Sequence, residues 1–591
     1  MSIKEPHASL EPALIAHKNG DIELAKALYV EVLSEEKNNI QALCNIGMIY
    51  KQKGQFSLSL TTIQKAIALC PRHVLGYINL ASLYIQIEEL DKAVATYAQA
   101  LKLSPKDANI YNHIAIAYEK KGDFVKAIHY YKEAIRCDEK FVKAYNNIGV
   151  ILYKQGRYIA ASEMFKMSLG VDDKFVSTYV NLGAAYNKAQ MYKEGEQALL
   201  EAIMIEEKNA GAYTNLGNIY NKMKRHEEAR IQHEMALMLD DKSASNHANI
   251  GITYKNLMLF KEAKTSLEKA IMIDPDFVNA HFDLATTYLL MGEYKKGFAE
   301  YEWRFKKEEM HSLFFDLSDI LKKPRFELNM ETEDKTLLLY SEQGFGDIIQ
   351  FARFAVVLKK KHPTLKLKIQ VRPELKTLLE EMDCFEEVLV RGEEVGAIDY
   401  QLALMSLPYV LKTTLKTLPN STPYMNVDGK IDVALDGKKL NIGVVWGASR
   451  TSESYEGRVY SLNYLKPLME DQDIQLYSLQ VAGDVEEMRE LGLNSEEIID
   501  LEDKLTDFKQ TALMIEKLDL VITSDTSVAH LAGALGKETW VMLQKNAEWR
   551  WGLDEHQTAW YPNHKLVHQE QQGDWESSFN KVYKMIEKRK K

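Results

Sequence analysis

The sequence predicts a long helical solenoid followed by an α/β region with two parallel sheets. A 34-residue repeat fills the first half of the chain, and short apolar strands alternate with helices from about residue 335 onward. The composition is typical of a folded protein, because 46% of the 591 residues are hydrophobic and 27% are charged. These observations exclude a largely disordered chain.

The repeat is marked by Asn-(Ile/Leu)-(Gly/Ala)-x-x-Tyr, which recurs at 45–50, 79–84, 181–186 and 215–220. Each unit reads as two short helices with a turn between them, and small residues on the second helix let neighbouring helices approach. The array is expected to span residues 1–311. Nine units without an insertion begin at residues 6, 40, 74, 108, 142, 176, 210, 244 and 278.

This pattern resembles the tetratricopeptide repeat family, whose period is also 34 residues. Stacked units of that family form a superhelix with a concave groove, and the resemblance implies that the sixth place of each unit faces the groove. Side-chain amides there can bind the backbone of an extended peptide, as in the asparagine ladder of the O-linked N-acetylglucosamine transferases, which this row resembles. Asparagine is also common at this place across the family, so a structural role stays open. The candidate acceptor-groove residues are Asn45, Asn79, Asn147, Asn181, Asn215 and Asn249.

The chain beyond a joint at 312–334 changes its pattern. Strand-like runs alternate with helical segments, which is typical of parallel sheets with helices on both faces. Two series of strands predict two Rossmann-like lobes, at 335–435 and 436–591. The expected strands are 337–340, 365–371, 387–390 and 400–403 in the first lobe, and 442–446, 474–479, 520–523 and 539–543 in the second.

The first candidate loop, Ser-Glu-Gln-Gly-Phe-Gly-Asp, directly follows the first strand. Gly344 and Gly346 permit a tight turn and close approach of a ligand to the backbone, and Gln343 lies in the same turn. Asp347 is expected in the first turn of the next helix, where it points into a cleft. An acidic residue at a helix start is also a common cap, so a structural role stays open here too.

The second candidate loop, Thr-Ser-Asp-Thr-Ser-Val-Ala-His, follows an apolar strand and opens another helix. Free backbone N–H groups at such a helix start suit a diphosphate. The hydroxyl groups of Ser524, Thr526 and Ser527 add donors, and His530 lies one turn into the helix. The loop therefore predicts an anion site.

Three segments in this order resemble the heptosyltransferase-related glycosyltransferases of bacteria: LLLYSEQGFGDIIQFARF, NIGVVWG and DLVITSDTSVAHLAGALGKETWVML. The tail EWRWGLDEHQTAWYP is similar to the branch of that group fused behind tetratricopeptide repeats. The resemblance covers about 337–575 and implies a two-lobed GT-B fold, with the acceptor on the first lobe and the donor on the second. It also implies inverting sugar transfer from a nucleotide sugar, which is a substrate, with no cofactor and no bound metal.

The resemblance also implies roles for individual residues. Asp347 matches the base that takes a proton from the acceptor hydroxyl. Either Arg450 or Arg458 matches a basic residue that neutralises phosphate oxygens, and Arg458 is the better match. Gln480 is a candidate nucleotide contact. The donor loop is matched by Asp525, Thr526, Ser527 and His530, and Trp549, Arg550 and Trp551 either stack on a ligand or pack the lobes together.

These features favour a cytoplasmic bacterial glycosyltransferase that modifies a protein acceptor, of which flagellin and adhesins are the class suggested by analogy. The net charge of −11 disfavours general binding to nucleic acid. The four cysteines form no CxxC pair, and no apolar run is long enough to span a membrane or form a signal-peptide core. Asp471-Gln-Asp473 is a DxD sequence, which we interpret as chance. Two alternatives stay open: an envelope-glycan transferase with a partner-docking array, and a non-catalytic scaffold.

Overall fold

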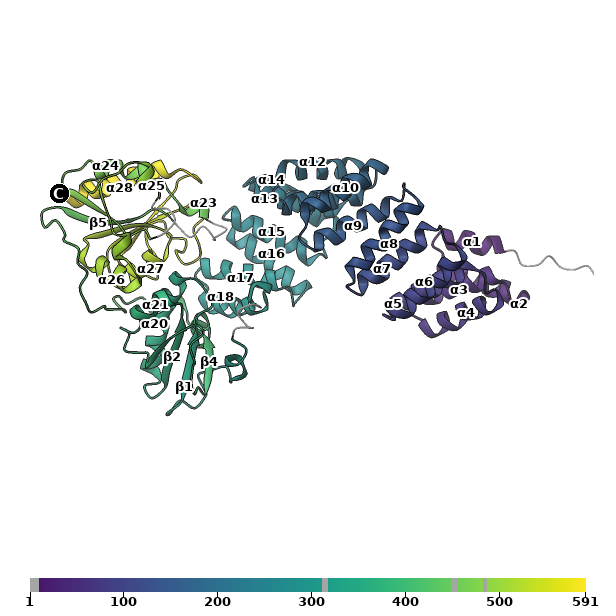
Figure 1. Ribbon diagram of the computed structural model, residues 1–591, viewed down its shortest axis with the longest axis horizontal. Helices are drawn as coiled ribbons and strands as arrows, with labels where there is room; N and C mark the ends of the chain where they lie inside the picture. Colours follow the sequence, from purple (N-terminus) through teal and green to yellow (C-terminus); the bar gives the residue numbers. More distant parts are fainter. Residues whose placement is uncertain (1–9, 311–316, 448–454, 482–485, 591) are drawn as a thin grey trace, which may run out of the picture. The chain divides into compact units, whose positions relative to one another are not determined.

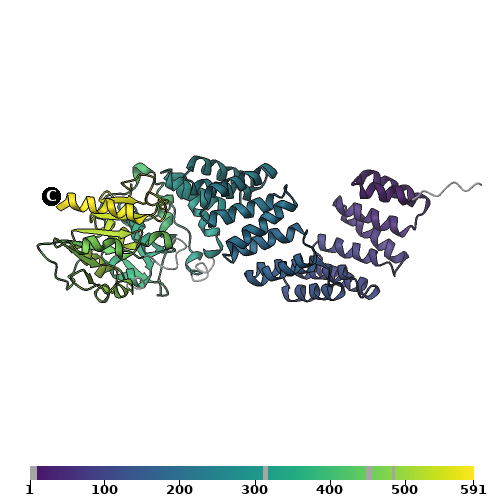
Figure 2. The same cartoon turned by 90° about the horizontal axis from the view of Figure 1, so that it is seen from above.

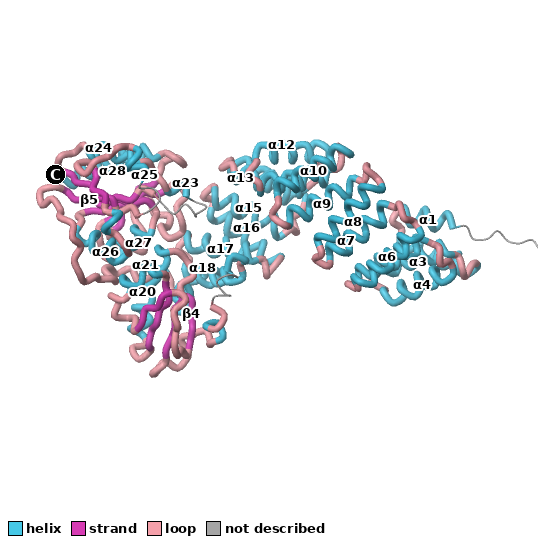
Figure 3. Tube along the Cα trace, in the orientation of Figure 1, coloured by secondary structure: helices cyan, strands magenta, loops and turns pink. Residues whose placement is uncertain are grey.

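The computed structural model describes residues 10–310, 317–447, 455–481 and 486–590. The chain forms two compact units, Met1–Asp240 and Asp241–Lys591. Figures 1 and 2 show them as ribbons coloured along the sequence, and Figure 3 separates helices from strands. The described residues contain no helix that is long and apolar enough to cross a membrane.

The first unit consists of helix pairs stacked in chain order (Figures 1 and 2). The first helix of each pair begins where the repeat predicts, although the start predicted at residue 6 lies outside the described residues. The helices are α1 (Leu10–Lys18), α2 (Ile22–Glu35), α3 (Ile40–Gln52), α4 (Phe56–Leu69), α5 (Val74–Gln86), α6 (Leu90–Leu103), α7 (Ala108–Lys120), α8 (Phe124–Cys137), α9 (Val142–Lys154), α10 (Tyr158–Val171), α11 (Val176–Lys188), α12 (Tyr192–Ile205), α13 (Ala210–Lys222) and α14 (His226–Leu239).

Small and aromatic residues account for this stacking. Ala93 and Ala127 are fully buried where helices approach, and Tyr97 and Tyr131 fill the space beside them. The turn inside each unit needs a positive φ, which glycine adopts without a steric penalty, as at Gly54, Gly122 and Gly156. In units without that glycine, Glu88, Gln190 and Lys224 adopt the same left-handed conformation.

The second unit begins with two further repeats and continues into the α/β region. The repeats are α15 (Ala244–Asn256) with α16 (Phe260–Ile273), and α17 (Val278–Leu290) with the short α18 (Tyr294–Tyr301). A 3₁₀ turn at Glu302–Lys306 follows α18 directly. The main α/β elements are β1 (Thr336–Tyr340), α20 (Phe345–Lys361), β2 (Lys366–Val371), α21 (Pro373–Leu379), β3 (Glu387–Val390), β4 (Tyr400–Ala403), α22 (Leu407–Val410), β5 (Leu440–Val445), α23 (Tyr455–Arg458), α24 (Lys466–Met469), β6 (Ile474–Ser478), α25 (Glu486–Glu490), β7 (Ile498–Asp500), α26 (Phe508–Lys517), β8 (Leu520–Ser524), α27 (Ser527–Ala534), β9 (Thr539–Leu543), β10 (His564–His568) and α28 (Trp575–Lys590).

The strands form two parallel sheets, which appear as two separate magenta groups in Figure 3. The first sheet has the order β3-β2-β1-β4, and the second has the order β10-β9-β8-β5-β6-β7. Each predicted strand is present with ends shifted by at most two residues. Strands β7 and β10 were not predicted, because Ile498–Asp500 is short and His564–His568 places polar residues at both ends.

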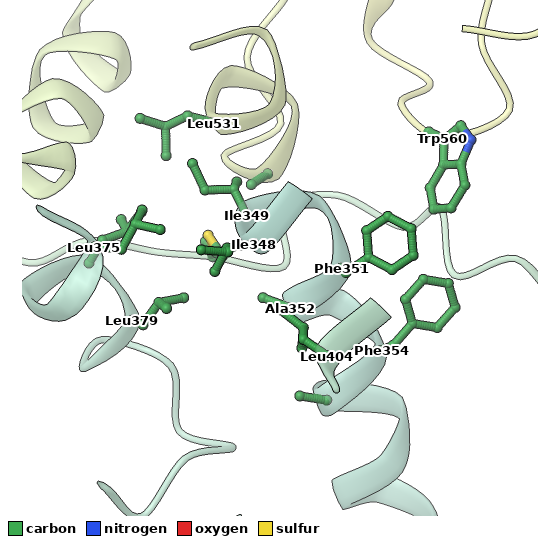
Figure 4. Packing of buried hydrophobic residues seen from close by; sticks show 14 of the residues in the cluster. Ile348, Ile349, Phe351, Ala352, Phe354, Leu375, Leu379, Leu404, Leu531 and Trp560 are labelled. Atoms are coloured by element: carbon green, nitrogen blue, oxygen red, sulfur yellow. The ribbon is translucent and has the colours of Figure 1, made fainter. Parts of the chain in front are cut away.

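One hydrophobic core joins the last repeat to both sheets. Phe298 of α18 packs edge-on against Phe351 of α20 and against Trp549, which follows β9. Figure 4 shows Trp560 beside Phe351 and Phe354, and Leu531 of α27 above Ile349 of α20. The end of the array is therefore part of the α/β core. The residues between α18 and β1 are also paired, because Phe326 N–H donates to the Gln401 carbonyl at the edge of β4.

A buried ionic network fixes this junction. The guanidinium of Arg304, which is 1% exposed, donates to Glu342 at 2.8 Å, to Glu302 at 2.8 Å and to the Ser406 hydroxyl at 2.8 Å. Glu342 belongs to the loop after β1, and its side chain is fully buried. Burial raises the pKa of the Glu342 carboxyl, and the charge of Arg304 opposes that shift. Arg304 thus connects the end of the repeat array to the loop that carries Asp347.

We expect Arg304→Ala to lower the free energy of unfolding of the second unit by about 3–5 kcal/mol, because it leaves the fully buried Glu342 carboxylate without its cationic partner. Arg325→Ala is the matched control: Arg325 pairs with the same Glu302 but is 42% exposed, so its loss should cost less than about 1 kcal/mol. Urea unfolding followed by tryptophan fluorescence measures both, since all seven tryptophans lie in the second unit. If the two substitutions lower the free energy of unfolding equally, Arg304 does not stabilise the junction in the way described.

Candidate functional site

Each sheet changes its winding direction once. Strands β2 and β3 lie on one side of β1 and β4 on the other, while β6 and β7 lie on one side of β5 and β8 to β10 on the other. In open α/β sheets, ligands bind outside the carboxyl ends of the strands at such a switch point. The loops after β1, β5 and β8 occupy these places and carry Asp347, Gly447 and Asp525.

Residues from these loops line one cleft of about 2010 Å³. Ligand pockets are typically roughly 300–1,000 Å³, so the cleft has room for two ligands at once. Asp347, which was expected to point into a cleft, lies in its wall together with Asp525. The predicted site residues in the lining are Gln343, Gly344, Gly346, Asp347, Arg458, Gln480, Asp525, Thr526, Ser527 and His530.

Two helix starts meet in the cleft because Gly346 has no side chain. A Cβ atom at Gly346 would lie 2.7 Å from Cδ2 of His530 and 3.5 Å from the Cα of Ser527. Helices α20 and α27 can therefore approach closely at their first turns. Asp347 occupies the start of its own helix, where its Oδ2 accepts the Gly344 N–H at 3.2 Å.

A chain of ion pairs connects the two lobes across the cleft. Arg550 binds both Asp347 and Glu548, and Glu548 also binds Arg458. The Nε atom of Arg458 lies 3.5 Å from Oδ2 of Asp525. Asp347, which follows β1 of the first sheet, is thus joined to Asp525, which follows β8 of the second sheet, through alternating acids and bases.

Burial dominates the titration of Asp525. Desolvation raises the pKa of its carboxyl to about 6, while the charge of Arg458 opposes the rise and that of Glu548 adds to it. A carboxylate held at this cost in a cleft is a feature of functional sites more often than of purely structural ones. Asp525 is therefore partly protonated in mildly acidic solution.

His530 is held neutral and in a fixed orientation. Burial lowers its pKa well below the usual range, and the positive charges of Arg550 and Arg458 add to that shift. Its Nδ1 atom lies 3.0 Å from the Tyr561 hydroxyl, and its ring stacks on Trp551 with centroids 5.2 Å apart. The neutral imidazole has one nitrogen that donates a hydrogen bond and one that accepts, and it adds no charge to the cleft.

The start of α27 presents free donors to the cleft. Thr526 is the N-cap residue, and its side chain caps no N–H of the helix. The Ala529 N–H donates to the Thr526 carbonyl at 3.1 Å, which leaves the N–H groups of Ser527 and Val528 as the first-turn donors without an acceptor inside the helix. The hydroxyl of Thr526 lies 3.0 Å from that of Thr523. This arrangement suits a phosphate group.

Ser524 and Gln480 hold the loop after β5. Ser524 is fully buried, and its hydroxyl donates to the Gly447 carbonyl at 3.2 Å. Gln480 Oε1 accepts the Gly447 N–H at 3.1 Å while the residue also lines the cleft. The hydroxyl of Ser524, expected to contact a ligand, is instead used within the protein. Arg450, the weaker of the two predicted basic residues, lies outside the described residues.

The aromatic tail divides its roles. Trp549 and Trp551 are both buried in the core. Trp549 packs among Phe298, Phe351 and Trp560 and also lines the cleft, and Trp551 packs against His530. Arg550, between them, faces the cleft. Sequence reasoning did not single out Glu548 or the ion pair of Arg550. Their local signal is the alternation of charged residues with tryptophans in Glu-Trp-Arg-Trp.

The candidate groove residues also serve the array itself. The amide of Asn147 donates to Asn112 at 3.3 Å, and that of Asn181 donates to Asn146 at 3.0 Å. Asn45 donates to the Tyr29 hydroxyl at 3.1 Å, and Asn79 is buried. These amides therefore connect neighbouring helices. Asn215 and Asn249 are half-buried.

The Asp471-Gln-Asp473 sequence is bound by a lysine. Lys590 of α28 lies 2.8 Å from Asp471 and 2.7 Å from Asp473. Among the described residues, no group of three or more histidine, cysteine, aspartate or glutamate side chains is arranged to hold a metal ion. The two carboxylates fix the C-terminal helix.

We expect Gly346→Ala to lower the free energy of unfolding by about 1–3 kcal/mol, because the new methyl group would overlap His530. Gly344→Ala is the control, since a Cβ there meets only Oδ2 of Asp347, at 3.6 Å, and its φ is −70°. That change should cost less than about 1 kcal/mol. Urea unfolding of both variants tests the close approach, and equal costs would argue against it.

Asp525→Asn should stabilise the second unit by about 3 kcal/mol at pH 7.5 and by about half as much at pH 5. The folded-state pKa of about 6 exceeds the unfolded value, so the ionisation penalty grows as pH rises through this range. Asp554→Asn is the control, because backbone N–H donors lower the Asp554 pKa and its effect should not change between these pH values. A pH-independent effect of Asp525→Asn, measured by urea unfolding, would refute the burial assignment.

Comparison with known families identifies the repeats. Residues 40–73, 108–141 and 244–277 match tetratricopeptide repeat models, as do 142–171 and 209–237. Residues 81–122 match a model described as TPR repeat. The sequence resemblance is confirmed for this part of the chain, and such arrays typically mediate protein–protein interaction.

Three proteins illustrate what the chain is similar to. Protein FlbA of Caulobacter vibrioides is 24% identical over 329 residues, which cover 50% of this chain and 52% of that protein. The chain thus spans about half the length of the curated relative it matches. The crystal structure of the APC/C hetero-tetramer Cut9–Hcn1 matches with 17% identity and a TM-score of 0.36, covering 45% of this chain and 52% of that chain. A tetratricopeptide repeat protein from Parabacteroides merdae matches with 18% identity and a TM-score of 0.34, covering 41% of this chain and 96% of that chain.

Proposed function

We propose that the protein is a glycosyltransferase of the GT-B type that moves a sugar from a nucleotide sugar to a hydroxyl group of a polypeptide. One observation carries the proposal: a carboxylate from one parallel sheet and two guanidiniums from the other face the same cleft, beside an open helix start. The resemblance of the loops that hold them supports the same reaction class.

The donor diphosphate lies at the start of α27 in this proposal. The first-turn N–H groups and the hydroxyls of Thr526 and Ser527 bind its oxygens, and Arg458 and Arg550 supply positive charge. As the bond from the sugar to the phosphate breaks, negative charge grows on the leaving oxygen, and these groups stabilise it. The nucleotide then extends along the carboxyl ends of the second sheet, as in other α/β sites.

Asp347 acts as the general base. The acceptor oxygen attacks the anomeric carbon, its proton passes to the Asp347 carboxylate, and the nucleoside diphosphate leaves with the electron pair of the broken bond. A single displacement of this kind inverts the anomeric centre. The carboxylate must be ionised and free to contact the acceptor hydroxyl when the reaction occurs.

The acceptor side of the cleft supports a polypeptide. Lys255, Phe282 and Thr286 of the last two repeats line the same cleft as Asp347. Lys255 binds Asp283 at 2.8 Å, and Asp283 occupies the sixth place of its unit. A chain held along the inner face of these repeats would reach the base without leaving the protein surface, which raises its effective concentration. Flagellin-like and adhesin-like proteins of the bacterial cytoplasm are the acceptors proposed by analogy.

Thermal unfolding in a panel of nucleoside mono- and diphosphates tests the donor half of the proposal. A diphosphate that binds the folded state should raise the midpoint, and the rise should grow with the logarithm of its concentration relative to its dissociation constant. Arg458→Ala should reduce that shift, whereas Glu374→Gln, at an exposed cleft position, should leave it unchanged. If no nucleotide of the panel changes the unfolding midpoint of the wild-type protein, that result would count against the proposal.

Transfer itself is tested with labelled nucleotide sugars and separated soluble and membrane fractions of the source cells. We expect label in soluble protein, detected by intact-mass spectrometry, and at least a hundredfold lower rate for Asp347→Asn. Label found in membrane lipid would favour the envelope-glycan alternative, and wild-type rates in Asp347→Asn would favour the scaffold.

A further inference from the structure

We infer that Arg550 is a positioning residue whose guanidinium is shared between the base and the donor phosphate, so that donor binding releases Asp347. The inference rests on the proposed function and adds an order of binding to it. In the ligand-free protein, Asp347 is held by Arg550. A diphosphate takes the guanidinium, and the freed carboxylate then accepts the proton of the acceptor.

The geometry shows that Asp347 is engaged on both oxygens. One oxygen is bound by Arg550, and the other accepts the Gly344 N–H at 3.2 Å. The side chain is 16% exposed, so an acceptor hydroxyl has little access to it. A general base in this state needs a partner removed before it can accept a proton.

Arg550 is positioned to serve either partner. Its side chain is 11% exposed and lines the same cleft as Asp347, Thr526 and Ser527. Its charge acts on Asp347, Asp525 and His530, which come from both sheets. Its two terminal nitrogens bind different acids, one Glu548 and the other Asp347, and the nitrogen that binds Asp347 can donate to a phosphate oxygen instead, because a guanidinium binds both kinds of anion.

The charges of the cluster explain why an anion must displace a carboxylate. Three acids, Asp347, Asp525 and Glu548, surround the two bases Arg458 and Arg550. With all five groups ionised, the cluster carries one net negative charge. A diphosphate that binds these two guanidiniums therefore competes with the acids for them, and Asp347 is the acid that belongs to the opposite lobe.

The consequence is an ordered reaction in which the donor binds first. The base becomes available only when a phosphate occupies the site, which keeps Asp347 from acting on an acceptor in the absence of donor. Donor binding and proton transfer to Asp347 are therefore coupled through Arg550. In the protein without acceptor, the donor phosphate and the Asp347 carboxylate should compete for its guanidinium.

A double-mutant cycle on nucleotide affinity tests the coupling. Isothermal titration calorimetry with uridine, adenosine and guanosine diphosphates, and with inorganic pyrophosphate, is carried out on the full chain. Asp347→Asn should tighten binding about tenfold, because Arg550 is no longer held by a charged partner. Arg550→Gln should weaken binding, and in its presence Asp347→Asn should change the affinity less than about twofold.

Each other outcome overturns the inference. Unchanged affinity in Asp347→Asn would show that Asp347 and the phosphate do not compete, while the proposed function would stand. Equal tightening with and without Arg550 would show direct repulsion by Asp347 and not a shared guanidinium. Absence of binding by every variant and every probe would remove the proposed function together with the coupling. If Arg550→Gln does not fold, Arg550→Lys replaces it. In the Arg550→Lys background, Asp347→Asn should then raise the nucleotide affinity less than it does in the wild-type protein.

Discussion

The ion pair between Asp347 and Arg550 joins residues 203 positions apart and brings the two parallel sheets to one cleft. It forms only because α20 and α27 meet at their first turns, and they meet because Gly346 leaves room for His530. Asp347 lies at the switch point of the first sheet, and Arg550 lies in the connection between β9 and β10 of the second sheet. The position of the candidate base therefore depends on packing between lobes as much as on its own loop.

The last repeat is part of this arrangement. Phe298 packs against Phe351, on the same helix as Asp347, and against Trp549, next to Arg550, and Arg304 binds Glu342 in the loop between β1 and α20. An array attached by a loose linker would raise the local concentration of a bound partner without orienting it. Here the end of the array helps to build the wall of the cleft, so binding in its final repeats and chemistry in the cleft share a structural element.

The sequence predicts the repeats well and the site partly. Eight predicted unit starts, from residue 40 to residue 278, coincide with helix starts, because a 34-residue period repeats the same packing at each step.

The loops that carry Asp347 and Asp525 were also found, since a glycine-rich or hydroxyl-rich turn after an apolar strand is a local pattern. The ion pairs of Arg550 with Asp347 and of Glu548 with Arg458 were not, because these partners lie 203 and 90 positions apart and leave no periodic pattern in the sequence. Ser524 looked like a ligand contact, but its burial beside Gly447 depends on a neighbouring strand.

A crystal structure of the full chain with a bound nucleoside diphosphate is the measurement that tests the central claim most directly. The account predicts phosphate density at the start of α27, within hydrogen-bond distance of Thr526 and of both guanidiniums. It also predicts that Asp347 has separated from Arg550 and faces the wall formed by the last repeats. A nucleotide bound away from α27, or one bound there while the Asp347–Arg550 pair stays intact, would contradict it.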